Sequence, residues 1–170
     1  MTKSEIKVLL QWATANFPNM QERDMRPTAA LWEKMLADMP YHVAENALMK
    51  VLATAKFFPT VAEIRAAAVE ITQPAMPTAA EAWGEVVTAI SRYGYYREVE
   101  ALESLSPTVA QVVRFIGWKD ICTSEEPDII RAQFRKAYET HSAREREMAQ
   151  IPSDVRQLIS SVVKALPSIN

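Results

Sequence analysis

Apolar residues recur at three- and four-residue spacing along most of the chain, and prolines or polar residues interrupt the pattern between segments. This spacing places the apolar side chains on one face of a helix. The first part of the chain has four such stripes: Ile6, Leu9, Leu10, Ala13 and Phe17; Thr28, Leu31, Trp32, Met35, Leu36 and Met39; Ala44, Ala47, Leu48, Val51, Leu52 and Ala55; and Val61, Ile64, Ala68 and Ile71. We therefore expect four amphipathic helices here.

The same periodicity continues in the second part of the chain. A fifth stripe ends at Tyr93-Gly94, a seventh begins at Pro107 and ends at Gly117, and an eighth begins near Pro127. These stripes are Trp83, Val86, Val87 and Ile90; Val99, Leu102 and Leu105; Val109, Val112, Val113 and Ile116; and Ile130, Phe134, Ala137, Tyr138 and His141. After Pro152 a last amphipathic helix follows, with Val155, Leu158, Ile159, Val162, Val163 and Leu166. Convincing two-residue alternation is absent, so the predicted fold is all-α.

Helix starts are marked by polar residues. Thr2 with Glu5, and Thr60 with Glu63, have the spacing of a capping box, in which the threonine caps the helix and the glutamate caps the threonine. A Pro-Thr pair occurs four times, at Pro27, Pro59, Pro77 and Pro107. Because the spacings are unequal and the flanking residues differ, we interpret these pairs as shared helix-start chemistry rather than a repeat.

Proline placement predicts the domain organisation. The segment 73–77 contains Pro74 and Pro77 and is expected to be a short, stiff linker. It separates a small helical domain of about four helices over residues 1–72 from a second helical domain over 78–150. Residues 151–170 form a C-terminal amphipathic helix and tail.

Composition narrows the possible functions. The formal net charge is −2 and the sequence pI is about 5.8, so direct nucleic-acid binding is expected to be weak or absent. The single cysteine, Cys122, suits a reducing compartment, and its apolar neighbours indicate a buried thiol. His42 and His141 lack zinc-site spacing, and the three glycines form neither a phosphate loop nor a dinucleotide motif. We expect no enzyme activity, metal or cofactor, and no membrane span.

Three segments are candidates for binding a partner. Tyr95, Tyr96 and Arg97 have the chemistry of interface anchors, but such aromatic residues could equally serve as core. Arg131 and Arg135 belong to a basic helix face, which could bind DNA or could be a solvated face paired with Glu139. The last helix could place its apolar residues in a partner's groove or fold back on its own domain. Its candidate contacts are Val155, Leu158, Ile159 and Val162.

The first 72 residues resemble the helicase loader and inhibitor proteins of phages that infect Gram-positive bacteria. The resemblance lies in an aromatic-led helix, a Pro-Tyr corner at Pro40-Tyr41, an alanine-containing helix and an aromatic-Pro-Thr turn before a short closing helix. Its fold-signature residues are Trp32, Leu36, Phe57, Phe58, Pro59, Thr60 and Ile64. Phe57 and Phe58 are expected to pack beneath the closing helix against Trp32 and Leu36.

The resemblance implies a non-enzymatic replication adaptor from a phage or prophage. Family members bind the hexameric replicative helicase, restrain it and deliver it to an origin through a replication initiator protein, in the cytoplasm of the bacterial host. Their helicase contact lies toward the C-terminus, which corresponds here to residues 131–166. Two alternatives stay open: a small helical DNA-binding regulator that uses the basic face at 131–136, and a phage structural or assembly protein.

Overall fold

The computed structural model describes residues 1–73 and 75–165, with side chains described as far as Val162. Every regular element in these ranges is a helix, which confirms the predicted all-α fold. The chain divides into two compact units. The first unit contains the chain up to residue 73 and again from Glu147 onward, and the second contains Ala75–Arg146.

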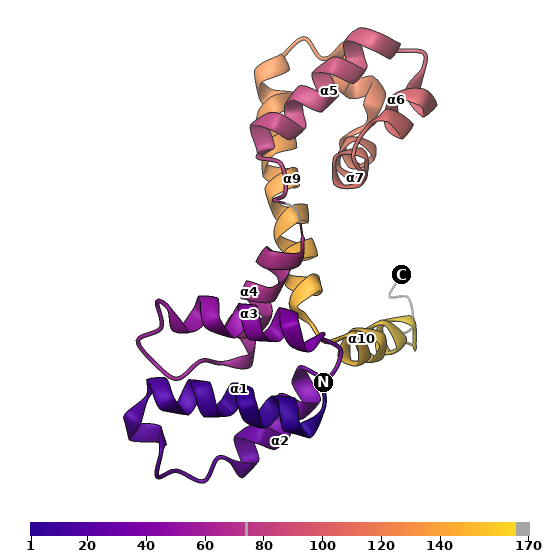
Figure 1. The fold of residues 1–170 in the computed structure, drawn as a ribbon. Helices are drawn as coiled ribbons and strands as arrows, with labels where there is room; N and C mark the ends of the chain where they lie inside the picture. Colours follow the sequence, from indigo (N-terminus) through magenta and orange to yellow (C-terminus); the bar gives the residue numbers. More distant parts are fainter. Residues whose placement is uncertain (74, 166–170) are drawn as a thin grey trace. The chain divides into compact units, whose positions relative to one another are not determined.

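The first unit begins with four helices that pack together. α1 packs on both α2 and α3, and α4 packs mainly on α3 (Figure 1). The unit also contains the last turn of α9 (Pro127–Gln150) and the whole of α10 (Ser153–Ala165). The N-terminal elements are α1 (Lys3–Asn16), the 3₁₀ turn η1 (Pro18–Met20), α2 (Arg26–Met35), α3 (Tyr41–Leu52) and α4 (Val61–Thr72).

The apolar stripes predicted from the sequence form the core of this unit. Its buried residues include Ile6, Leu9, Leu10, Ala13, Trp32, Leu36, Met39, Ala44, Ala47, Leu48, Ile64, Ala67 and Ala68. Phe58 packs on this core, with its ring centroid 6.0 Å from that of Trp32 and 6.0 Å from that of Phe17. The prediction for Phe57 is wrong, because its side chain is 83% exposed. Two consecutive residues in an extended loop point to opposite sides, so only one of the pair can face the core.

Both predicted capping boxes are present. The Thr2 hydroxyl accepts a hydrogen bond from the Glu5 amide, and the Glu5 carboxylate accepts one from the Thr2 amide. Thr60 and Glu63 repeat the arrangement at the start of α4. Of the four Pro-Thr pairs, those at Pro59 and Pro77 place threonine at the cap, whereas Pro27 and Pro107 lie in the first helical turn. The interpretation as helix-start chemistry is therefore confirmed, with two different chemistries.

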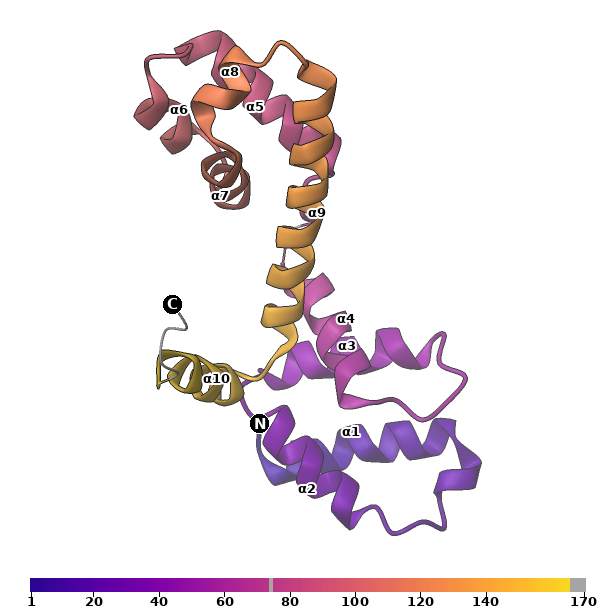
Figure 2. The ribbon, with the colours of Figure 1, turned by 180° about the vertical axis from the view of Figure 1, so that it is seen from behind.

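The second unit contains α5 (Ala79–Tyr93), α6 (Glu98–Ser104), α7 (Pro107–Ile116), α8 (Trp118–Thr123) and α9 as far as Arg146. Figure 2 shows the short helix α8 directly after α7. The sequence pattern did not predict α8, because six residues are too few to display helical periodicity. Gly117, at φ 105°, makes the corner between the two helices in a backbone conformation that favours glycine.

The core of the second unit lies between α5, α7 and α9. Its buried residues include Ala82, Val86, Ala89, Ala101, Leu105, Val109, Val112, Val113, Trp118, Ile121, Phe134 and Tyr138. The Trp118 indole donates a hydrogen bond to the Gly94 carbonyl at 3.2 Å, and the Tyr138 hydroxyl donates one to the Pro77 carbonyl at 2.9 Å. Val99 was assigned to an apolar stripe but is exposed, so α6 contributes Ala101, Leu102 and Leu105 instead.

Candidate partner-binding surface

The C-terminal helix α10 is attached to the first unit through its N-terminus. The Asp38 carboxylate, in the connection between α2 and α3, accepts a hydrogen bond of 3.0 Å from the amide of Ser153, the first residue of α10. The first amides of a helix have no partner within the helix, and a carboxylate there also complements the helix dipole. A residue 115 positions earlier in the sequence thus acts as the cap of α10.

Arg65 holds Asp38 in this position. Its guanidinium donates two hydrogen bonds to the Asp38 carboxylate, at 2.7 and 3.1 Å, and another of 2.9 Å to the Met35 carbonyl. Its Nε donates to the carbonyl of Gln150, the last residue of α9. The Arg65 side chain is only 7% exposed and that of Asp38 is 24% exposed. We call Asp38, Arg65 and their contacts to Gln150 and Ser153 the α10 anchor.

The anchor also changes the acidity of Asp38. Hydrogen bonds from Arg65, above all, and from Ser153 hold the pKa of the Asp38 carboxyl below its usual value of 3.8, against the opposing effect of burial. Because both partners favour the ionised form, the carboxylate is charged throughout the neutral range.

An apolar groove of about 680 Å³ runs beside the anchor. Its apolar lining comes from α2, from the turn before α4 and from the segment that leads into α10. These residues are Leu31, Trp32, Met35, Phe58, Pro59, Val61, Ala62, Ile151, Pro152, Val155 and Ile159. Two of the candidate contacts on the last helix, Val155 and Ile159, therefore face the N-terminal helices of their own unit.

The rest of the apolar stripe of α10 faces outward. Leu158 is 64% exposed and Val162 is 53% exposed, and Ile159 lies at the boundary between the groove and solvent. Leu31 of α2 also lines the groove and is exposed. We define the α10 surface as Leu31, Leu158, Ile159 and Val162. Val163 and Leu166, which the sequence pattern placed on the same stripe, lie outside the residues whose side chains are described.

The aromatic segment after α5 has two different environments. Tyr93 packs against the core of the second unit, with the Arg92 and Arg97 guanidiniums over its ring. Tyr95 and Tyr96 are both exposed, with their ring centroids 5.1 Å apart, and the Lys119 ammonium lies 5.8 Å from the Tyr95 centroid. Arg97 is paired with Glu100 at 3.0 Å. Tyr95 and Tyr96 are thus surface residues, available to a partner.

Arg131 and Arg135 lie one helical turn apart on α9 and are exposed. With Trp83, Ala79 and Asp128 they line a small hollow between α5 and α9. Among the described residues, neither arginine forms an ion pair with Glu139 or any other acid. The expected pairing of this face is therefore wrong.

Groups that could support other chemistry are few in the part of the chain that the structure describes. There, no cluster of three or more His, Cys, Asp or Glu side chains could hold a metal ion. Cys122 is half-buried rather than fully buried, and this partial burial raises the pKa of its thiol. No described helix combines the length and the apolar character that crossing a bilayer requires.

The α10 anchor could not be assigned from the sequence. Arg65 was noted only as a lone arginine among alanines in α4, and Asp38 only as a residue that takes part in the family resemblance. One signal was present: α4 has Ile64, Ala67 and Ala68 on its buried side, so a basic residue beside them needs an internal acidic partner. The sequence gives no means of choosing Asp38 among the 21 acidic residues.

Comparison with known proteins assigns the N-terminal part of the chain. Residues 1–65 match the family model for the N-terminal domain of the phage helicase loader known as the gene 39 protein. This range contains α1, α2, α3 and the beginning of α4, including Asp38 and Arg65. No curated protein and no solved structure matches the chain. Residues 1–65 are therefore the N-terminal domain of the phage helicase loader family.

Proposed function

We propose that this chain is a non-enzymatic DNA-replication adaptor of a phage or prophage. It binds the hexameric replicative helicase in the bacterial cytoplasm, restrains it, and helps to load it at the origin through the initiator protein. The observation that carries this proposal is the match of residues 1–65 to the helicase loader domain.

The α10 surface is the region that we assign to the helicase contact. It supplies exposed leucine, isoleucine and valine side chains at helical spacing, which is the pattern with which a helix binds an apolar groove. The α10 anchor holds this surface at one orientation relative to the loader domain. Less conformational entropy is lost on binding when the contact residues are already ordered.

Restraint of the helicase follows from selective binding. A hexameric helicase alternates between conformations during its ATPase cycle, and a protein that binds one of them more tightly shifts the population toward it. An adaptor of this kind needs no nucleotide hydrolysis of its own. The size of the restraint equals the difference between its affinities for the two conformations.

The test mixes the purified chain with the replicative helicase of its host and, separately, with that of its phage. Size-exclusion chromatography with and without a non-hydrolysable ATP analogue measures the complex, and phosphate release measures helicase ATPase activity. We expect co-elution with at least one helicase and reduced ATPase activity. Absence of a complex with either helicase under both nucleotide conditions would contradict the proposal.

Adding the initiator tests the loading step. We expect the initiator, bound to origin DNA, to recruit the helicase only when the chain is present. Recruitment of the same amount of helicase without the chain would show that it restrains the helicase but does not deliver it.

A further inference from the structure

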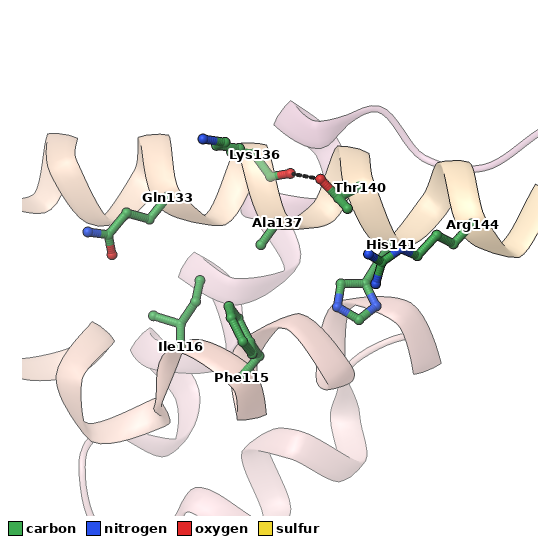
Figure 3. Close-up of a pocket in the computed structure, with 8 residues that line it drawn as sticks. All are labelled: Phe115, Ile116, Gln133, Lys136, Ala137, Thr140, His141 and Arg144. Atoms are coloured by element: carbon green, nitrogen blue, oxygen red, sulfur yellow. Dashed lines mark hydrogen bonds between the residues drawn. The ribbon is translucent and has the colours of Figure 1, made fainter. Parts of the chain in front are cut away.

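The second unit has a surface hollow of about 590 Å³ between the end of α7 and the middle of α9. Phe115 and Ile116 line it from α7, and α9 contributes side chains spaced by three and four residues (Figure 3). These are Gln133, Lys136, Ala137, Thr140, His141 and Arg144. We call it the Phe115 hollow. Its lining contains two permanent cations and no carboxylate.

Phe115 is unusual for its place in the fold. It is 76% exposed, although the neighbouring Ile116 packs against the core of the unit. Figure 3 shows its ring facing α9, with His141 and Arg144 beside it and Gln133 at the other end of the hollow. Lys136 extends away from Phe115 in this view and lies at the rim. An exposed aromatic face next to hydrogen-bond donors is costly in water unless a ligand covers it.

The cations at the hollow are available to a ligand. Lys136 and Arg144 are exposed and form no ion pair with any residue that the structure describes. The nearby Glu145 is engaged elsewhere, because its carboxylate accepts a hydrogen bond of 2.7 Å from the Thr108 hydroxyl. In contrast, Arg97 beside the exposed Tyr96 is already paired with Glu100.

Charge is also unevenly distributed within this unit. Residues 127–146 contain five lysines and arginines and three acids, whereas residues 75–126 contain four and eight. The basic side chains are thus concentrated on one helix of an otherwise acidic unit. The net charge of −2 describes the whole chain and conceals this local excess.

We propose that the Phe115 hollow binds single-stranded nucleic acid. One base stacks on the Phe115 ring, and Arg144 and Lys136 contact the flanking phosphates, which is how proteins bind single strands without sequence preference. The Gln133 amide can donate to and accept from a base edge. A duplex does not fit, because its bases are stacked and their faces are inaccessible to the ring. An acidic protein segment would satisfy the cations but would leave the ring face without a flat partner.

The test measures fluorescence anisotropy of labelled dT12 and rU12 with the full-length chain at low salt. We expect Phe115→Ala to weaken binding about 5- to 100-fold, from the loss of one stacked base, and Phe115→Tyr to retain it. Phe115 is exposed, so both variants should fold, which circular dichroism checks. Tyr96→Ala removes an exposed aromatic residue elsewhere in the unit and should leave the affinity unchanged.

Charge variants give an independent readout. Arg144→Gln and Lys136→Gln should each reduce the slope of log affinity against log salt by about 0.7, the value for one phosphate contact to a single strand. Arg97→Gln changes the net charge equally and should leave the slope unchanged. Stronger binding of dT12 or of rU12 identifies the sugar and supports the proposal in either case.

Three results would overturn it: no binding of either oligonucleotide at low salt; equal binding of a 12-base-pair duplex with no effect of Phe115→Ala, which indicates general cation attraction; or binding of a labelled polyglutamate peptide and not of the oligonucleotides. The last result would assign the hollow to an acidic protein. Because the hollow and the α10 surface lie in different units, neither outcome depends on whether the helicase binds.

Discussion

Arg65 and Asp38 differ from the other ion pairs of the first unit in how they are surrounded. The pair Arg26–Asp24 joins neighbouring residues on the surface, whereas Arg65 is almost fully buried and bonds Asp38, Met35 and Gln150 at once. A buried cation that loses its carboxylate keeps its desolvation cost without compensation. The α10 anchor should therefore contribute to stability where a surface pair does not.

We predict that Asp38→Asn lowers the free energy of unfolding of the first unit by about 2 to 3 kcal/mol, since it leaves Arg65 without its counter-charge. Amide hydrogen exchange over residues 153–162 should become faster, because α10 also loses its cap. The control is Asp24→Asn, which breaks the exposed Arg26 pair and should change stability by about 0.5 kcal/mol or less. Similar effects of the two substitutions would show that the anchor has no special role.

The acidity of Asp38 gives a matching pH dependence. Since its folded-state pKa lies below the usual 3.8, the unfolded chain binds the proton more readily. The anchor's electrostatic contribution is therefore complete above about pH 5 and is lost as the pH falls through 3.8 toward the folded pKa. Hydrogen exchange of α10 should accelerate in this range in the wild type. In Asp38→Asn it should show a smaller change, and an equal change would contradict the assignment.

Phe57 and Phe58 make a second comparison at the residue scale. Phe58 contacts Trp32 and Phe17 and is half-buried, whereas Phe57 is exposed. Phe58→Ala should destabilise the first unit by about 2 to 3 kcal/mol, below the range for fully buried phenylalanines. Phe57→Ala should cost about 0.5 kcal/mol or less. Chemical denaturation measures both, and a larger loss for Phe57→Ala would contradict the structure.

Among the elements, helix starts were the most predictable from the sequence. The capping boxes at Thr2 and Thr60 were read correctly, because both partners lie within four residues and the chemistry is local. The apolar stripes likewise identified most of the core. α8 was missed because it is too short to show a period, and the direction of Phe57 was missed because loop geometry is not periodic.

The candidate site was less predictable, for a physical reason. The α10 anchor joins residues 27 and 115 positions apart, and only packing brings them together. The sequence marked the α10 stripe as a candidate but left open whether it docks on its own domain. In the structure Val155 and Ile159 face the N-terminal helices while Leu158 and Val162 face solvent, so the stripe is divided between the two environments.

The caps provide a prediction at the element scale. Thr60→Ala should lower the stability of the first unit by about 1 kcal/mol, because the Glu63 amide loses its acceptor at the start of α4. Thr28→Ala is the matched control, since Thr28 lies inside the first turn of α2, whose start has no side-chain cap. Chemical denaturation should show little change for this control. Equal losses would mean that side-chain volume, rather than capping, sets the effect.

At the scale of the whole molecule, the chain leaves the first unit after α4, forms the second unit and returns to the first through the end of α9 and α10. The matched loader domain is thus completed by a helix from the far end of the sequence. The second unit carries its own exposed features, the Phe115 hollow and the Tyr95–Tyr96 pair. We infer a division of labour, in which the first unit binds the helicase and the second binds nucleic acid.

The most direct measurement of the central proposal is the affinity of the helicase for a variant of the α10 surface. Leu158→Ala combined with Val162→Ala removes exposed side chains without touching the groove or the anchor. Its control combines Val87→Ala with Val99→Ala, two exposed valines of the second unit. By surface plasmon resonance on immobilised helicase, we predict at least about tenfold weaker binding of the α10 variant, as expected for loss of central apolar contacts, and no change for the control. Wild-type affinity of the α10 variant would contradict the account.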